Sequence, residues 1–169
     1  MIYQGSYCAL ITPFKNGELD KSSFKKIIKW HIDQGTKGII PCGTTGESPT
    51  LSHDEHKEVV ELAVDAAEGK IQVIAGTGSN STNEAVALTK HAKDTGADSA
   101  LIVVPYYNKP SQQGLIEHYL KIANTVDLPI IIYNIPGRSI VDMHNDTIIE
   151  LAEHKNIIGI KDATNDLSR

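Results

Sequence analysis

The chain of 169 residues has little of what marks several specialised classes of protein. It holds two cysteines, Cys8 and Cys42, which lie far apart and have no metal-ligand spacing around them. We therefore expect reduced thiols in a cytoplasmic protein, without a disulfide framework. No apolar run approaches the ~20 residues of a membrane span. Residues 1–5 lack the charged and apolar regions of a secretion signal, so we expect neither a membrane nor an export role.

Basic clusters, metal motifs and nucleotide loops are also absent. The net charge is -5, which argues against a nucleic-acid partner. His53 and His56 form a pair at helical spacing, but no carboxylate or thiol cluster completes a zinc site around them. Residues 76–78, Gly-Thr-Gly, lack the third glycine of a dinucleotide fingerprint, and there is no phosphate loop. We expect no metal and no cofactor.

A repeat of about thirty residues, the size of a βαβ unit, runs through the whole chain. Each repeat has a short apolar strand, a polar loop, an amphipathic helix and a glycine. The predicted strands cover residues 7–12, 38–42, 71–75, 100–104, 129–133 and 156–162. The predicted helices begin after Asp20, Ser52, Ser81 and Ser111 and near His144.

Apolar strands that alternate with helices predict a parallel α/β sheet, because such strands need helices on both faces. Two architectures satisfy this pattern. One is an open doubly wound sheet, which closes with five or six strands. The other is a (β/α)₈ barrel, which needs about 250 residues. Length alone favours the open sheet.

Lys161 lies near the end of the last predicted strand, residues 156–162. Gly159 shares its face of the strand and leaves room beneath the lysine stem. A lysine in a dry site is pushed toward the neutral amine, which can attack a ketone and form a Schiff base. The alternative is a lysine that merely ends a strand and extends to water.

Other polar side chains follow the predicted strands at their carboxyl ends, where the site lies in either architecture. The loop Gly43–Glu47 can offer free N–H groups and the hydroxyls of Thr44 and Thr45 to an anion, or it is an ordinary glycine turn. Tyr133 ends an isoleucine-rich strand, where its phenol can relay protons or simply pack in the core. Arg138 can clamp a carboxylate or lie in solvent.

Three motifs in this order make the chain resemble a known family. They are Gly-Thr-Thr-Gly-Glu at 43–47, Tyr-Asn-Ile-Pro-Gly-Arg at 133–138 and Gly-Ile-Lys-Asp-Ala-Thr at 159–164. From Tyr3 to its last residue, the chain resembles the dihydrodipicolinate synthase branch of the class I pyruvate-dependent aldolase and lyase family. The resemblance implies a (β/α)₈ TIM barrel and overrules the argument from length. Family members are longer, so we expect residues 1–169 to be a single incomplete barrel domain with about six strands and five helices, from a fragment or truncated gene.

The resemblance also implies roles for individual residues. Lys161 matches the Schiff-base lysine, and Tyr133 matches the tyrosine that carries protons to and from the intermediate. Thr44 matches the threonine that links two tyrosines of the relay, and Thr45 helps to hold the pyruvate carboxylate. Tyr107 matches a tyrosine that enters the neighbouring subunit's site, which implies a homo-oligomer, often a dimer of dimers.

The implied reaction condenses pyruvate with L-aspartate 4-semialdehyde, the first committed step of lysine (diaminopimelate) biosynthesis. The Lys161 imine acidifies the methyl group of pyruvate, and the resulting enamine attacks the aldehyde. Arg138 matches the arginine that receives the carboxylate of the second substrate. No cofactor takes part.

A regulatory site is implied as well. Relatives inhibited by lysine bind it at a subunit interface. Glu84 can meet the ammonium group of that ligand, although it also completes a capping box with Ser81. We therefore expect lysine to act as a feedback inhibitor. The matching residues are Ser48, His53, His56, Asn80, Glu84 and Tyr106.

Other functions fit these residues as well. N-acetylneuraminate lyase and 2-keto-3-deoxy sugar acid aldolases share the lysine, the tyrosine and the glycine-rich loop. Arg138 and the pair Thr44–Thr45 favour the synthase, because sialic acid lyases resemble Gly-Ser-Thr-Gly-Glu in that loop. A rival of another class is a non-catalytic protein that binds a keto acid or lysine, and an inert fragment is a third alternative.

Overall fold

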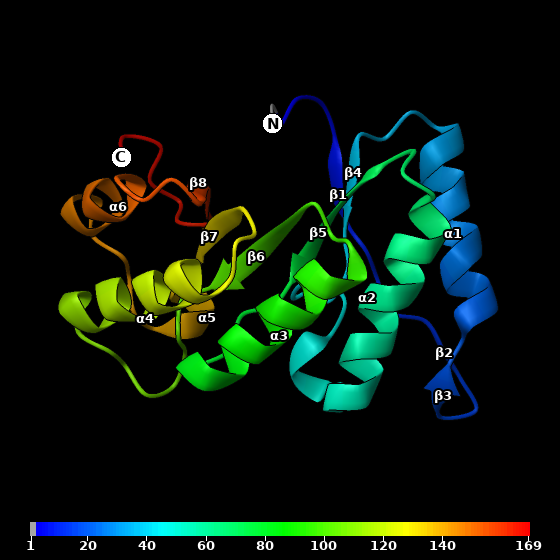
Figure 1. The fold of residues 1–169 in the computed structure, drawn as a ribbon, viewed down its shortest axis with the longest axis horizontal. Helices are drawn as coiled ribbons and strands as arrows, with labels where there is room; N and C mark the ends of the chain where they lie inside the picture. The colour runs from blue at the N-terminus through cyan, green and yellow to red at the C-terminus, as the bar shows by residue number, and fades with distance from the viewer. Residues whose placement is uncertain (1–2) are drawn as a thin grey trace. The chain divides into compact units, whose positions relative to one another are not determined.

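The computed structural model describes residues 3–169, which divide into two compact units. The first unit contains the chain up to Gly76 together with Asp94–Asp98, and the second contains Thr77–Lys93 and Ser99–Arg169. Figure 1 follows the elements in chain order. Each unit has three parallel strands, and helices follow the strands along the chain.

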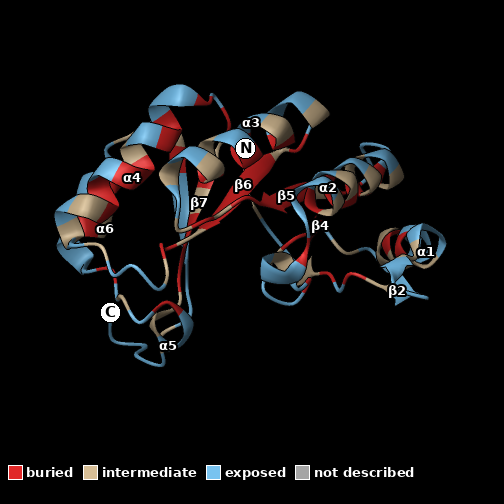
Figure 2. Cartoon of the chain, turned by 90° about the horizontal axis from the view of Figure 1, so that it is seen from below, coloured by how far each residue is buried: buried red, intermediate tan, exposed pale blue. Residues whose placement is uncertain are grey.

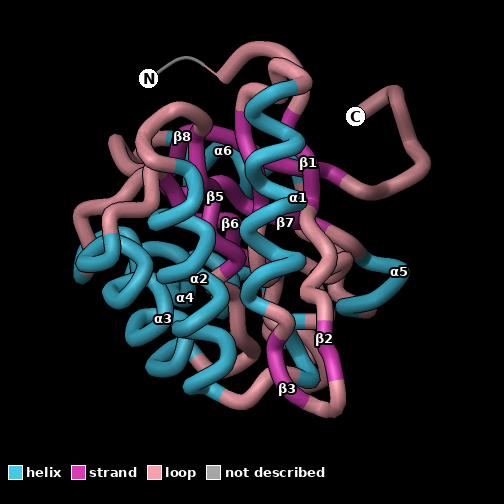
Figure 3. Tube along the Cα trace, turned by 90° about the vertical axis from the view of Figure 1, so that its right-hand side faces the viewer, coloured by secondary structure: helices cyan, strands magenta, loops and turns pink. Residues whose placement is uncertain are grey.

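In the first unit the strands pair in the order β1, β4, β5, all parallel. Ile39 of β4 lies opposite Cys8 on one side and Val73 on the other. A small hairpin of β2 and β3 precedes the first helix (Figure 3). The elements are β1 (Tyr7–Ala9), β2 (Phe14–Lys15), β3 (Glu18–Leu19), α1 (Lys21–Asp33), β4 (Gly38–Ile40), the 3₁₀ turn η1 (Ser48–Thr50), α2 (His53–Ala67) and β5 (Gln72–Gly76).

The second unit repeats the pattern, with β6, β7 and β8 paired in parallel. Its helix α5 is a single turn that directly follows β7, and the sequence pattern did not predict it. The strands and helices that the sequence did predict are present within a few residues of their expected bounds. The elements are α3 (Thr82–Thr95), β6 (Ser99–Val103), α4 (Gln112–Thr125), β7 (Ile130–Asn134), α5 (Pro136–Ser139), α6 (Asn145–Ala152) and β8 (Ile157–Asp162).

Helix starts follow from local side-chain capping. The Asp20 carboxylate accepts a hydrogen bond from the Ser23 backbone N–H at 3.0 Å and caps α1. Ser52 and Glu55 form a capping box at the predicted start of α2, with bonds of 3.2 and 2.8 Å. Ser111 caps α4. These predictions are confirmed, because each depends on residues within one helical turn.

The core of each unit lies between its strands and helices. Ile39 and Ile28 are fully buried in the first unit, and Ile102, Ile130 and Tyr119 are fully buried in the second. Figure 2 shows the buried residues running along β6. Alternating strands and helices around such cores establish the α/β class.

The strand β8 departs from the sequence prediction, which took residues 156–162 for a buried strand. Only Ile157 is buried, while Ile158 and Ile160 are 42% and 36% exposed. Among the described residues β8 pairs with β7 alone and stands at the end of the strand order. A strand with one neighbour leaves its apolar side chains uncovered, whatever its composition.

Candidate active site

The centre of the candidate site is the pair Tyr133 and Lys161, which lie directly opposite each other on β7 and β8. The Nζ atom of Lys161 stands 4.3 Å from the centroid of the Tyr133 ring. This is cation–π geometry, and it holds the amine beside the phenol. Two residues that are 28 positions apart in the sequence are therefore neighbours because of strand register.

The surroundings of this pair are wetter than the sequence predicted. Tyr133 is buried, with 7% exposure, but Lys161 is exposed. The expected dry site around the lysine is not found in this chain, because Lys161 lies on the edge strand β8 and no described element covers it. The space around Gly159 is open, so the room that the sequence predicted beside the lysine stem is present.

Backbone hydrogen bonds hold the end of β7 on both sides. The carbonyl oxygen of Tyr133 accepts from the Val104 N–H at 2.9 Å, and the carbonyl oxygen of Asn134 accepts from the Ala163 N–H at 2.8 Å. Asn134 is also paired in register with Asp162. The strand ends that carry the phenol and the amine are thus locked to their neighbours.

Arg138 lies in the one-turn helix α5, close behind β7 in the chain. Its side chain is exposed, whereas the adjacent Ser139 is buried. The Ser139 hydroxyl lies 2.9 Å from the carbonyl oxygens of both Ile135 and Val141, which ties the turn down. An exposed guanidinium on an anchored turn is suited to meeting an incoming carboxylate.

The loop that contains Thr44 and Thr45 belongs to the first unit. Both threonines are exposed. The N–H groups of Gly46 and Glu47 donate to the carbonyl oxygens of Gly43 and Thr44 at 3.0 and 3.2 Å. The prediction that this loop offers free N–H groups is therefore wrong for these two residues. The exposed threonine hydroxyls are the polar groups that the loop offers to a ligand.

Tyr107 is held in a strained position on the surface. Its φ of 72° lies in the left-handed region, which side chains other than glycine rarely adopt. The side chain is 86% exposed. The neighbouring Asn108 side chain donates to the carbonyl oxygen of Asn80 at 3.1 Å and anchors the loop. A projecting aromatic ring on an anchored, strained loop is typical of a contact surface.

The six residues matched to a lysine site are divided between the units. In the first unit His53 is exposed, while His56 is buried, with its Nε2 2.9 Å from the Gly76 carbonyl oxygen. In the second unit the Glu84 carboxylate accepts a hydrogen bond from the Ser79 hydroxyl. Ser48, Asn80 and Tyr106 are half-buried.

Asn134 was missed as a site residue, although it stands inside the second motif. Its side chain is fully buried at the end of β7 and bonds to Asp142 at 2.8 Å. A polar residue that ends an isoleucine-rich strand was the available signal. Its partner Asp142, and Arg169, which bonds to Asp142, carried no signal in the sequence, because neither lies in a motif.

Residues 2–169 match the model of the Dihydrodipicolinate synthetase family. The chain belongs to this family. It is 59% identical over 168 residues to the 4-hydroxy-tetrahydrodipicolinate synthase of Parvibaculum lavamentivorans, covering 99% of the chain and 58% of the relative. It is 61% identical to the enzyme of the same name from Pelagibacter ubique, covering 57% of that relative. The chain therefore spans less than three fifths of the length of these relatives.

Solved structures give the same result. The dihydrodipicolinate synthase from Aquifex aeolicus matches 99% of the chain and 57% of its own length, with 56% identity and a TM-score of 0.97. The chloride-inhibited synthase from Acinetobacter baumannii, complexed with pyruvate, matches at 56% identity and 0.96 over 98% of the chain and 57% of its own length. The synthase from Cyanidioschyzon merolae with lysine bound matches at 44% and 0.93, over 96% and 57%. The fold is that of the family's (β/α)₈ barrel, of which this chain carries six strands, so the open sheet favoured by length is wrong.

The described residues hold neither a membrane-spanning helix nor a metal-binding cluster. None of the helices is long and apolar enough to cross a membrane. Within residues 3–169, no group of three or more histidine, cysteine, aspartate or glutamate side chains is placed to hold a metal ion.

Proposed function

We propose that this chain carries the Schiff-base-forming part of a 4-hydroxy-tetrahydrodipicolinate synthase, a carbon–carbon lyase of the aldolase type. The observation that carries the proposal is the Lys161 amine, which stands 4.3 Å from the Tyr133 ring centroid in the register of two adjacent strands. The identity of about 60% to enzymes of that name supports it. The pyruvate complex of the Acinetobacter baumannii relative supports pyruvate as the first substrate.

The proposed chemistry begins at the Lys161 nitrogen. The neutral amine attacks the keto carbon of pyruvate, and loss of water leaves an imine. The imine withdraws electrons, so a proton leaves the methyl group and an enamine forms. Tyr133 is the adjacent phenol that can take up and return protons during these steps. Pyruvate would be held by its carboxylate, for which the exposed Thr45 hydroxyl is the proposed partner, and the family resemblance implies a role for Thr44 in the proton relay.

The enamine carbon then attacks the aldehyde of aspartate semialdehyde, whose carboxylate we assign to Arg138. A carbon–carbon bond forms, and the aldehyde oxygen takes up a proton. The amino group of this substrate displaces the Lys161 nitrogen from the imine carbon and closes the ring. The lysine returns to its starting state, so no oxidant, reductant or cofactor is needed.

Exposure of Lys161 bears directly on this proposal. An amine in water is mostly protonated and attacks carbonyl groups poorly, so the reaction needs a drier surrounding. The relatives are longer than this chain, and we propose that their additional length covers β8. Residues 1–169 then act as one incomplete barrel domain, which remains a prediction.

Borohydride trapping tests the proposal. Two proteins are prepared: the 169-residue chain alone, and a joined protein in which this chain is followed by the remaining C-terminal part of the Parvibaculum lavamentivorans relative. Each is incubated with pyruvate and borohydride, and the modified lysines are identified by mass spectrometry. We expect a reduced pyruvyl adduct on Lys161, more in the joined protein, and none in Lys161→Arg. Lys155→Arg is the control, since this exposed lysine lies just before the same strand. An adduct spread evenly over exposed lysines, or none in the joined protein, would refute the assignment.

Substrate choice needs its own measurement. The joined protein is supplied with pyruvate and either aspartate semialdehyde or N-acetylmannosamine, and pyruvate consumption is followed. We expect consumption with the semialdehyde only, and we expect Arg138→Ala to raise its KM more than that of pyruvate. Consumption with the amino sugar would assign the chain to the sialic acid lyases instead.

Regulation by lysine and assembly are the finer parts of the proposal. The lysine-bound structure of the Cyanidioschyzon merolae relative supports lysine as the regulatory ligand, and the six matched residues are its proposed contacts. The exposed, strained Tyr107 supports a contact with a second subunit, in a homo-oligomer that we propose is a dimer of dimers. Millimolar lysine should slow the joined enzyme, and Glu84→Gln should weaken that inhibition. Sedimentation of Tyr107→Ala tests the contact.

A further inference from the structure

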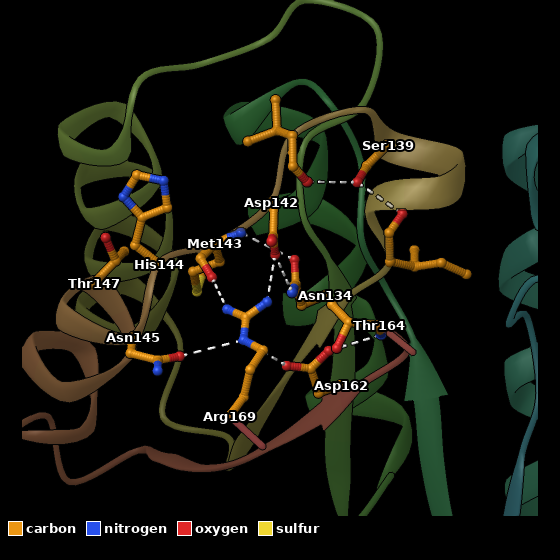
Figure 4. A network of polar contacts seen from close by, with 12 residues as sticks. Asn134, Ser139, Asp142, Met143, His144, Asn145, Thr147, Asp162, Thr164 and Arg169 are labelled. Carbon is orange, nitrogen blue, oxygen red and sulfur yellow. Dashed lines mark hydrogen bonds and ion pairs between the residues drawn. The ribbon is translucent and has the colours of Figure 1, made fainter. Parts of the chain in front are cut away.

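One guanidinium joins three segments of the second unit (Figure 4). Nη1 of Arg169 lies 2.8 Å from the Asp142 carboxylate, and Nη2 donates to the carbonyl oxygen of Met143. Nε lies 3.3 Å from the side-chain oxygen of Asn145 and 3.7 Å from the Asp162 carboxylate. The side chain of Arg169 is only 16% exposed. It therefore connects the segment after α5, the start of α6 and the end of β8.

The same network reaches the end of β7 through Asn134. Its amide nitrogen donates to Asp142 Oδ1, the atom that Arg169 also contacts. Its amide oxygen accepts from the Met143 N–H at 3.1 Å, and its carbonyl oxygen accepts from the Ala163 N–H at 2.8 Å. Asn134 is fully buried, so its own bonding atoms are shielded from water, although Asp142 is partly exposed.

Each end of the network is one residue away from the candidate site. Asn134 follows Tyr133, and Asp162 follows Lys161, in two strands whose register sets these residues opposite each other. Arg138 lies in the short turn α5, between Asn134 and Asp142, the carboxylate partner of Arg169. A movement of the network would therefore move the phenol, the amine and the exposed guanidinium relative to one another.

The charges favour a role in geometry over a role in stability. Burial alone would raise the pKa of the Asp142 carboxyl, but hydrogen bonds from Arg169 and Asn134 outweigh it and hold the pKa below its ordinary value. The ion pair thus persists at neutral pH. Asp142 is 47% exposed, however, and ion pairs so close to water add little to folding stability. What the fork of Arg169 supplies is a fixed direction toward several acceptors at once.

We infer that Arg169 is a positioning residue, which holds the ends of β7 and β8 and the α5 turn together so that Lys161 stays over Tyr133. This inference rests on the proposed function, since it assigns Arg169 a part in Schiff-base formation. Arg169 does not touch the reacting atoms and acts through Asp142 and Asp162. A misplacement of about 1 Å can cost up to about a hundredfold in rate, so a loosened pair should react more slowly.

The test compares Arg169→Gln, Arg169→Lys and Asp142→Asn, in the 169-residue chain and in the joined protein. Lys25→Gln is the control. It also removes an ion pair, that of Lys25 with Asp65, but this pair lies in the first unit, away from the network. Trapping rates are measured against pyruvate concentration. We expect Arg169→Gln to lower the maximal rate about tenfold and to leave the half-saturating pyruvate concentration within about twofold. Arg169→Lys should keep part of the parent's rate, and the control Lys25→Gln should keep all of it.

Hydrogen exchange gives a readout that does not depend on the reaction. The Ala163 N–H, which is bonded to Asn134, should exchange several-fold faster in Arg169→Gln than in Lys25→Gln, with melting temperatures within a few degrees of each other. If exchange and trapping are both unchanged in the Arg169 variants, the inference is wrong. If the parent protein forms no adduct but the Ala163 N–H exchanges faster in Arg169→Gln, the proposed function is wrong. The network then has only a structural role, which is to hold the strand ends together.

Discussion

Replacing Gly76 with alanine tests the packing beneath the turn that leads into the loop of Thr44. A Cβ atom at Gly76 would lie 2.1 Å from the carbonyl oxygen of Cys42, 2.6 Å from its carbonyl carbon and 3.0 Å from the nitrogen of Gly43. The shortest of these is about 1.3 Å closer than the 3.4 Å at which ordinary contact begins. All three atoms belong to the backbone, so no side chain can turn away to make room.

The neighbouring backbone has little freedom to retreat. Cys42 already has a left-handed φ of 54°, is 3% exposed, and directs its thiol to the carbonyl oxygen of His56. The carbonyl oxygen of Gly76 itself is bonded to the His56 ring. Overpacking commonly costs about 1–3 kcal/mol, and a contact with fixed backbone belongs at the upper end. We therefore expect Gly76→Ala to lower the free energy of unfolding by about 3 kcal/mol.

Two glycines provide matched controls. At Gly38 a Cβ would also approach within 2.1 Å, but the atom it meets is in the half-buried side chain of Tyr7, whose ring can shift by giving up its hydrogen bond to Gln72. At Gly137 nothing lies within 4 Å. We expect a loss of about 1 kcal/mol for Gly38→Ala and a change within about 0.5 kcal/mol for Gly137→Ala.

The assay is urea unfolding followed by circular dichroism, with the three variants and the parent compared at equal m-value. The midpoints should fall in the order Gly137→Ala, Gly38→Ala, Gly76→Ala. A midpoint for Gly76→Ala equal to that of Gly137→Ala would refute the argument, because the Cys42 backbone would then have moved aside at no cost.

Three further predictions concern capping, protonation and thiol reactivity. Ser52→Ala should lower the unfolding free energy by about 1 kcal/mol, because the hydrogen bond to Glu55 N–H is lost, while Ser52→Asp should retain it; equal urea midpoints would contradict this. Burial lowers the pKa of His118 to about 4, so its ring should titrate there by NMR. Between pH 6.5 and 4 the unfolded chain takes up a proton that the folded one does not, and stability should fall by up to about 1.4 kcal/mol per pH unit; His118→Gln should lack this slope, and titration near 6.5 would exclude it. Burial raises the pKa of the Cys42 thiol to about 12, so a maleimide at pH 8 should label the half-exposed Cys8 first and Cys42 only in urea; equal native rates would count against this.

Local structure was predictable from short stretches of the chain. The caps at Asp20, Ser52 and Ser111 were all identified from neighbouring residues. Such features depend on side chains within about four positions, and the competing choices are few. The one-turn helix α5 was missed, because four residues are too short for any periodicity.

Burial along β8 was not predictable in the same way. Its isoleucines have the pattern of a strand packed on both faces, yet Ile158 and Ile160 are exposed. Composition reports what a strand can bury, whereas exposure depends on how many neighbours the strand actually has. The wetness of Lys161 has the same origin.

For the candidate site, the sequence motifs predicted Tyr133 and Lys161 as site residues, since both lie at the ends of apolar strands and carry reactive groups. Their contact depends on the register of β7 with β8, and the clamp of Asn134, Asp142 and Arg169 depends on side-chain directions across 35 positions of chain. The linear order of residues thus defines which elements form and which chemical groups are present. Folding alone selects which of those groups meet, because pairing and packing are made between segments that are distant along the chain.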